Sequence, residues 1–330
     1  MRAYVARRLV YMGITLFVIT SIVFLIFQVL SPVNPVDIII DPKFKPEVKE
    51  ALRSLYGLDE PLYVRYFKYI KSLFLWDFGY SFKTEQPIVT ELLYRLANTV
   101  LLLGSALVLT TILGIIVGVF AAARRGKRLD VLSVGVGLFT WGVPTFFIQL
   151  LFLLFFSYYT YINFGVRVFP LRGMTSIPPP TDLLGYITDV LWHLAQPLLT
   201  LVIVGFGGMA LYTRNMMLNI LTQDYVVTAR AKGVDEGTVL YRHAFRSILP
   251  PIVTMLALAV PSVVTGAIIT EYIFTWPGIG SWYIGALLAG DYPVVQTVLY
   301  LYAVLMLLSN FAADLIYAAV DPRIRISGGR

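Results

Sequence analysis

The chain alternates between long uncharged, mostly apolar runs and shorter polar segments. A helix needs about 20 apolar residues to cross roughly 30 Å of hydrocarbon. Six runs reach that length, and only the last contains a charged residue, Asp314; they lie approximately at 9–30, 97–123, 131–161, 190–213, 247–270 and 294–320. The pattern predicts an all-α integral membrane protein with six transmembrane helices.

The first run is too long to be the core of a cleaved signal peptide, which typically has about 7–15 apolar residues. No small-residue cleavage site follows it before Ser31 and Pro32, so we predict a retained span. Composition agrees with a membrane protein, because 58% of the residues are hydrophobic and 14% are charged. The predicted organisation is an N-terminal tail and first span (1–30), an external subdomain (31–96), a five-helix core (97–320) and a C-terminal tail (321–330).

Basic residues in short connections indicate which side of the membrane each connection occupies. They gather in both tails and in two alternating connections: Arg2, Arg7, Arg8, Arg124, Arg125, Lys127, Arg128, Arg214, Arg230, Lys232, Arg242, Arg246, Arg323, Arg325 and Arg330. The short connections on the other side hold only Arg167 and Arg172, and the long segment 31–96 has equal numbers of basic and acidic residues. Both termini are therefore predicted to be cytoplasmic. We interpret the net charge of +7 as a topology signal and not as a nucleic-acid-binding surface.

Prolines and a glycine divide the external segment 31–96 into two predicted short helices, at 46–57 and from Pro61 onward. The second is amphipathic, with one apolar face and one basic face at helical spacing; these faces are Leu62, Tyr66, Tyr69, Ile70 and Leu73, and Arg65, Lys68 and Lys71. Such a helix fits the membrane interface, a cap over the external mouth of the bundle, or simple packing on the spans.

A polar segment with two helix caps lies within the cytoplasmic connection 214–247. Asp224 is a candidate N-cap for a helix over 225–232, and Gly233 can adopt the left-handed conformation that ends a helix. A second helix can begin at Asp235. Taken alone, this pattern also fits a generic capped connector.

Catalysis within the membrane has few candidate residues in this sequence. It contains no Cys, and its two histidines, His193 and His243, fall on opposite sides of the predicted topology. Asp314 has no second aspartate in the membrane, so an aspartyl protease is disfavoured, and pairing with a basic neighbour is the simpler role. Glu271 lies at the outer end of the fifth run, where it either contacts a transported solute or occupies the membrane interface.

The sequence contains no Gly-x-x-x-x-Gly-Lys-Ser/Thr phosphate loop, so we predict that any ATP chemistry belongs to a partner. Pro144, Pro197 and Pro261 interrupt the apolar runs, and each can kink a helix. No charged residue lies beside them, as an ion-coupled carrier would require. An ion-coupled secondary transporter or channel nevertheless stays the alternative class.

Several segments together resemble the first permease subunit of binding-protein-dependent ABC importers for dipeptides, oligopeptides and nickel. They cover essentially the whole chain in order: RRLVYMGITLFVITSIVFLIFQVLSP, YGLDEPLYVRYFKYIKSLFLWDFGYSF, ANTVLLLGSALVLTTILGIIVGVFAAARRG, QDYVVTARAKG, EYIFTWPGIG, DYPVVQ and DPRIR. The resemblance implies the type I ABC importer permease fold. It also implies a homologous second permease, two ATPase subunits that bind ATP and Mg, an external solute-binding protein, and no cofactor in this chain.

The resemblance further implies that the cytoplasmic segment is the "EAA" loop that docks on an ATPase. The candidate coupling residues are Asp224, Tyr225, Thr228, Ala229, Arg230, Ala231, Lys232, Gly233, Asp235 and Glu236. This chain departs from the broader superfamily at Val227, where Glu is frequent, and at Ala244, Phe245 and Arg246, where an Ile-x-Leu-Pro pattern is usual. Peptide-type permeases tolerate both departures, so the resemblance points to that subfamily within the same class.

The third to fifth spans are predicted to line a path for a peptide-like or similarly sized solute between the two permeases. The candidate path residues are Pro144, Ser262, Thr265, Gly266 and Glu271. Small and hydroxylated residues suit a close, mildly polar contact surface. They fit ordinary helix packing equally well.

Overall fold

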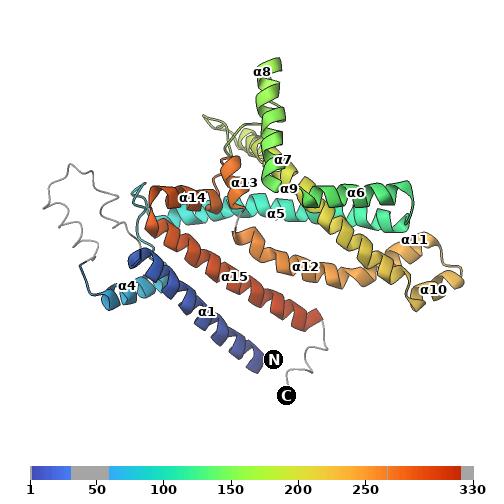
Figure 1. The fold of residues 1–330 in the computed structure, drawn as a ribbon, viewed down its shortest axis with the longest axis horizontal. Coiled ribbons are helices and arrows are strands. Elements are labelled where there is room, and N and C mark those ends of the chain that lie inside the picture. Colours follow the sequence, from blue (N-terminus) through green and yellow to red (C-terminus); the bar gives the residue numbers. More distant parts are fainter. Residues whose placement is uncertain (1, 31–58, 266, 321–330) are drawn as a thin grey trace.

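The computed structural model describes residues 2–30, 59–265 and 267–320, and helices dominate this part of the chain (Figure 1). Six of the described helical stretches are long and apolar enough to cross a membrane. The prediction of an all-α protein with six spanning helices is therefore confirmed. The predicted external helix at 46–57, the path candidate Gly266 and the tail 321–330 lie outside the described residues.

Three helices form one layer of the molecule. Helix α15 (Tyr292–Val320) lies between α1 (Arg2–Gln28) and α12 (Arg246–Thr265) and packs against both (Figure 1). An ion pair joins Arg8 of α1 to Asp314 of α15. The predicted pairing of Asp314 with a basic neighbour is confirmed.

The centre of the bundle is the long contact between α5 (Ile88–Ala123) and α9 (Leu183–Leu221), with α6 (Arg128–Gly142) packed on α9. Glycine permits this close approach. A Cβ atom added at Gly118 of α5 would lie 2.6 Å from both the Ala210 carbonyl oxygen and the Thr213 Cβ of α9. Small residues at helix contacts are the usual means of bringing backbones together in membranes, where van der Waals packing drives association.

The third apolar run is not the single span predicted at 131–161. Helix α6 ends at Gly142, and α7 (Thr145–Phe152), the π-helical η1 (Leu153–Tyr159) and α8 (Thr160–Phe164) form a second helical rod that turns away from α6 (Figure 1). Pro144 causes the break because proline excludes the helical conformation at the preceding residue. Val143 is accordingly extended, with φ −82° and ψ 132°.

The fifth apolar run also differs from the prediction of one span at 247–270. Its helix begins earlier, as α11 (Glu236–Thr238) and η2 (Val239–Phe245) continue into α12, and it ends at Thr265. Helix α13 (Ile268–Ile273) follows as a separate element, and α14 (Ile279–Ala289) folds back beside it. Likewise α5 and α9 extend beyond 97–123 and 190–213. Hydrophobicity marks the part of a helix that lies in lipid, whereas backbone hydrogen bonding continues into the polar flanks.

The amphipathic helix that the sequence predicts after Pro61 is α4 (Leu62–Leu75), and Pro61 precedes its first residue as predicted. Its apolar face packs on α1, where the Tyr66 hydroxyl lies 2.7 Å from the Ser21 hydroxyl and the Tyr66 ring centroid lies 5.1 Å from that of Phe24. Leu73 is buried as well. The simple-packing interpretation is confirmed for this face, while Phe67 and Phe74 remain exposed.

The α5–α9 contact generates a first prediction. Gly118→Ala will lower the apparent Tm of the purified complex, because overpacking of a close contact costs about 1–3 kcal/mol. Gly104→Ala is the matched control on the same helix, where the added Cβ would meet only the Val100 side chain at 3.9 Å. Alanine favours helix over glycine by about 1 kcal/mol, so Gly104→Ala should leave Tm equal or slightly raised. Equal Tm values for both variants would contradict the close packing.

Candidate functional site

The predicted coupling helix is α10 (Asp224–Ala231), which projects with α11 at the end of the molecule where α5 ends and α6 begins (Figure 1). The prediction that Asp224 is its N-cap is wrong. Gln223 occupies the cap position with an extended backbone and makes no side-chain cap bond, and Asp224 is the first helical residue. A carboxylate in the first turn still favours the helix, since the amino end carries positive partial charge.

Gly233 ends α10 in the predicted left-handed conformation, with φ +77°. The turn is closed by backbone hydrogen bonds, in which the N–H of Gly233 donates to the Arg230 carbonyl at 2.9 Å and the N–H of Val234 donates to the Ala229 carbonyl at 3.3 Å. Left-handed geometry disfavours any residue that carries a Cβ. The sequence prediction for this glycine is therefore confirmed.

Asp235 is the N-cap of the next helix, α11, as predicted. Its Oδ2 accepts the Thr238 N–H at 2.8 Å. Hydrogen bonds from Thr238 lower the pKa of the Asp235 carboxyl below its usual value. The cap holds the start of α11 directly after the Gly233 turn. This second helix runs without interruption into α12 and is not the separate short helix that the sequence predicted.

Two side chains connect α10 to the spans on either side of it. The Arg230 guanidinium pairs with Glu236 of α11, at 3.1 Å from Nε to Oε2, and donates from Nη1 to the Leu221 carbonyl of α9 at 3.3 Å. The Tyr225 hydroxyl lies 2.8 Å from the Ser247 hydroxyl of α12. The candidate coupling residues are thus brought together in one structural unit.

Most of α10 faces away from the rest of the chain. Val226 is its one buried residue, and it anchors the helix inward. Thr228, Ala231 and Lys232 are exposed, and so is Val227, the position that departs from the superfamily pattern. An exposed helix whose base is fixed at both ends is a surface suited to contact with another molecule.

The predicted path residues within the described part of the chain lie on several elements. Pro144 is exposed at the break between α6 and α7, and Ser262 and Thr265 lie in the last turns of α12. Glu271 lies on α13, which packs against α7 and α14. These residues thus lie at two helix breaks, one between α6 and α7 and one between α12 and α13. Their contact with a solute stays a prediction.

Glu271 is fully buried, with 0% of its surface exposed, and both its position at the membrane interface and its contact with a solute stay predictions. Its carboxylate accepts the Thr99 hydroxyl of α5 at 2.8 Å and the Ser281 N–H of α14 at 3.0 Å. A Cβ added at Gly278 would collide with this carboxylate. Sequence reasoning missed the burial because it depends on Thr99 of α5 and on the fold-back of α14, which meet Glu271 only after folding.

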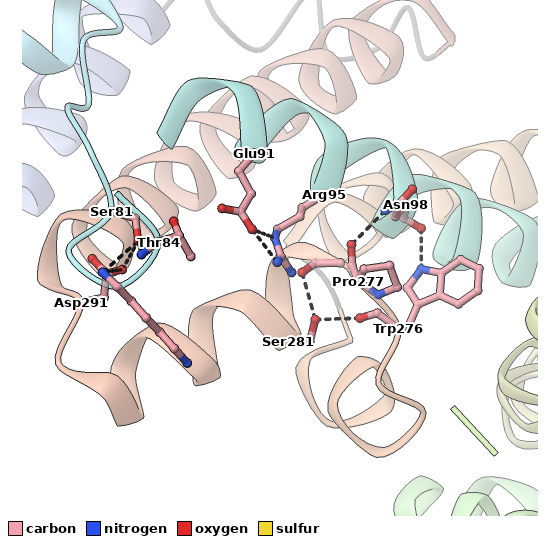
Figure 2. Close-up of polar contacts among 11 residues, drawn as sticks. Ser81, Thr84, Glu91, Arg95, Asn98, Trp276, Pro277, Ser281 and Asp291 are labelled. Atoms are coloured by element: carbon pink, nitrogen blue, oxygen red, sulfur yellow. Dashed lines mark hydrogen bonds and ion pairs between the residues drawn. The ribbon is translucent and has the colours of Figure 1, made fainter. Parts of the chain in front are cut away.

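Figure 2 shows a second set of bonds at the same end of α5. The Trp276 indole N–H donates to the Asn98 carbonyl at 2.9 Å, and the Asn98 side chain donates to the Pro277 carbonyl at 3.0 Å. The Thr99 hydroxyl also accepts the N–H of Ile279 at 2.9 Å. These bonds hold the turn between α13 and α14 against the helix.

Asp291 is a buried carboxylate whose role the sequence did not reveal, although it begins the DYPVVQ segment. It accepts the Ser81 hydroxyl at 2.5 Å and the backbone N–H of Phe82 at 3.1 Å (Figure 2). The bonds tie the turn that precedes α5 to the start of α15. In the sequence, Asp291 follows a glycine and comes two positions before a proline. Its partners lie about two hundred positions away, so no local pattern predicts these bonds.

Arg95 of α5 lies between these two sets of bonds and was also missed. Its guanidinium pairs with Glu91 at 2.8 Å from Nε to Oε1 (Figure 2). It also lies 5.2 Å from the centroid of the Trp282 ring. It contributes to two pockets, of about 190 and 480 Å³. The i,i+4 spacing of Glu91 and Arg95 is visible in the sequence, whereas the contact with Trp282 is not.

Metal binding and histidine chemistry find no support in the described residues. No group of three or more potential metal-ligating side chains occurs among them. His193 is buried, with its Nδ1 2.8 Å from the Asp189 carbonyl one helical turn away. This is the geometry of a histidine within a packed helix.

Comparison with known proteins defines the class. The sequence profile described as "Binding-protein-dependent transport system inner membrane component" matches residues 114–326, and the corresponding N-terminal profile matches residues 1–103. The chain belongs to this family of transport permeases, and it is a multi-pass membrane protein. The family gives no support to an ion-coupled secondary transporter or channel.

Relatives along the full length refine the comparison. The chain is 34% identical to the oligopeptide transport system permease protein AppB of Bacillus subtilis, with 98% of this chain and 99% of the relative covered. It is 35% identical to the di/tripeptide transport system permease protein DppB of Pseudomonas aeruginosa over the same shares. It is 33% identical to the glutathione transport system permease protein GsiC of Escherichia coli, with 98% of each chain covered. The resemblance to peptide-type permeases is confirmed.

The burial of Glu271 generates a second prediction. Glu271→Ala will lower the free energy of unfolding by on the order of 2–4 kcal/mol, because the Thr99 hydroxyl and the Ser281 N–H lose their acceptor. The measurement is the apparent Tm of the purified complex. The control is Asp77→Ala, which removes an exposed carboxylate at the same end of the molecule. Retained Tm together with lost solute uptake would instead support a direct transport role for Glu271.

Proposed function

We propose that this chain is the first permease subunit of an ATP-driven importer and that α10 is its docking element for an ATPase. The observation that carries the proposal is the exposed α10, fixed to α9 and α11 by Arg230 and to α12 by Tyr225. A helix held at its base transmits an applied force to the spans, whereas a loosely attached loop would absorb it.

The rest of the assembly follows from the family. The partners are a homologous second permease, two ATPase subunits that bind ATP and Mg, and an external solute-binding protein, all acting at a lipid bilayer. The absence of a phosphate loop in the sequence supports the assignment of ATP hydrolysis to partners. This chain then needs no cofactor and is not itself an enzyme.

The proposed orientation has both termini and α10 in the cytoplasm. It rests on the basic residues in the tails and in the connections that hold Arg124 and Arg230, because cytoplasmic loops of membrane proteins are enriched in Lys and Arg. In this orientation α4 and the turn between α13 and α14 face the outside, toward the solute-binding protein.

The proposed solute is a dipeptide or oligopeptide. Support comes from the names of the full-length relatives, which are permeases of oligopeptide, di/tripeptide and glutathione transport systems. The solute would pass between the two permeases along a surface that includes the break at Pro144 and the end of α12. Capture of peptides by the cognate binding protein, measured by calorimetry, tests the solute class independently of α10.

The docking role generates a third prediction. Gly233→Val will uncouple ATP hydrolysis from uptake, because a left-handed conformation costs a residue with a Cβ about 1–2 kcal/mol. That strain lowers the population of correctly seated α10 by roughly tenfold. Hydrolysis and uptake are measured together on the whole complex in proteoliposomes.

Two variants control this experiment. Gly233→Asn should retain coupling, since Asn tolerates the left-handed region better than β-branched residues do. Gly165→Val introduces the same backbone strain at another exposed turn, where φ is +68°, and should leave coupling intact. Full solute-stimulated transport by Gly233→Val would overturn the docking assignment of α10.

A further inference from the structure

A pocket of about 300 Å³ lies beside the coupling segment. Its walls come from three places: the turn between α5 and α6, the last turns of α9, and the Arg230–Glu236 pair. In Figure 1 the end of α5 and the start of α6 lie at the same end of the molecule as α10 and α11. The pocket therefore touches both a membrane span and the segment that we propose as the docking element.

Cations dominate the polar part of this pocket. It is lined by Arg124, Arg125, Lys127 and Arg230, with Glu236 as the one acidic residue. Glu236 is already paired with Arg230. The pocket consequently has an excess of positive charge that favours an anionic ligand.

Two of these cations have no acidic partner among the described residues. The hydrogen bond from Arg214 lowers the pKa of the Asp130 carboxyl most, and the nearby charge of Arg125 lowers it further. In contrast, Arg124 and Lys127 are exposed and take part in no ion pair within the described ranges 2–30, 59–265 and 267–320. Their charges are available to a ligand.

An apolar stripe leads along α5 directly to Arg124. Val108, Ile112, Ile116 and Phe120 recur every fourth residue, which places them on one face of the helix, and each is between 47% and 56% exposed. The Arg124 guanidinium lies 5.5 Å from the centroid of the Phe120 ring. The apolar stripe therefore ends at the positive charge of Arg124.

This combination matches the two parts of a phospholipid. An acyl chain needs an exposed apolar face within the hydrocarbon, and its phosphate needs cations at the membrane surface next to that face. Basic pockets between helices on the cytoplasmic side are suited to anionic headgroups, and each nearby Lys or Arg contributes about 1 kcal/mol. Leu218 and Leu221 of α9 extend the apolar lining inside the pocket.

We propose that this pocket binds the phosphate group of an anionic phospholipid of the cytoplasmic leaflet, with Arg124 and Lys127 as its principal contacts. Because the Arg230–Glu236 pair forms one wall, an occupied pocket stabilises the position of α10. The regulatory part of this inference rests on the proposed docking function. The binding part rests on the pocket, its charges and the apolar stripe, and the choice of leaflet rests on the proposed orientation.

The test uses the complete transporter in nanodiscs of phosphatidylcholine that contain increasing fractions of phosphatidylglycerol. Bound phosphatidylglycerol is counted by native mass spectrometry, and ATP hydrolysis is measured on the same samples. The double variant R124Q/K127Q removes two charges from the pocket. The matched control, R7Q/R128Q, removes two exposed charges from the same membrane side, at positions that do not line the pocket.

We expect R124Q/K127Q to lose one tightly retained phosphatidylglycerol and to require a higher fraction of that lipid for full hydrolysis, by roughly fivefold per charge removed. The control should stay within about twofold of the unmodified complex. The single variants R124Q and K127Q, each with a shift of about fivefold, provide the same comparison if the double variant does not assemble.

Three results would overturn the inference. Equal lipid retention by the pocket variant and the control would show that the cations act only through the general surface potential. Displacement of the retained lipid by inorganic phosphate at low millimolar concentration would assign the pocket to a free anion. Unchanged lipid retention with loss of ATPase subunits from the R124Q/K127Q complex would assign the cations to a protein contact. Lipid retention is measured separately from coupling, so failure of the docking role of α10 would leave the binding result interpretable.

Discussion

The membrane requires every buried backbone N–H and C=O group to find its partner within the protein, and the architecture depends on this requirement. Continuous helices meet it by themselves. Where a helix ends inside the bundle, its backbone groups need partners from other segments, and the clearest case is the turn between α13 and α14. There the Thr99 hydroxyl accepts the N–H of Ile279 and the Glu271 carboxylate accepts that of Ser281. One side chain of α5 and one of α13 thus supply the acceptors that the first turn of α14 lacks.

The same helix, α5, connects the two candidate sites. Its first turns make the bonds around Asn98 and Thr99, Gly118 packs closely onto α9, and its last residues lead to the basic pocket. Close backbone contact leaves little room for α5 and α9 to slide past one another, because interiors are tightly packed. A displacement at the end of the molecule that holds α10 is therefore expected to be shared by both helices.

Local chemistry predicted much of the fold and of the coupling segment. Apolar runs revealed the spans, Gly233 revealed the left-handed exit and Asp235 revealed the second cap, since each depends on a few neighbouring residues. The break at Pro144 was visible as a proline but not as a change in helix direction. The burial of Glu271, the bonds of Asp291 and the contact of Arg95 with Trp282 depend on chain segments that meet only after folding. No pattern of nearby residues encodes them.

The attachment of α10 at both of its ends has a mechanical consequence. Arg230 bonds the Leu221 carbonyl of α9, and Tyr225 lies against Ser247 of α12. A load applied to α10 is therefore divided between two spans that are separated in sequence but joined through this short helix. Under the proposed docking role, we infer that this short helix carries the load to α9 and α12 together and does not act on one span alone.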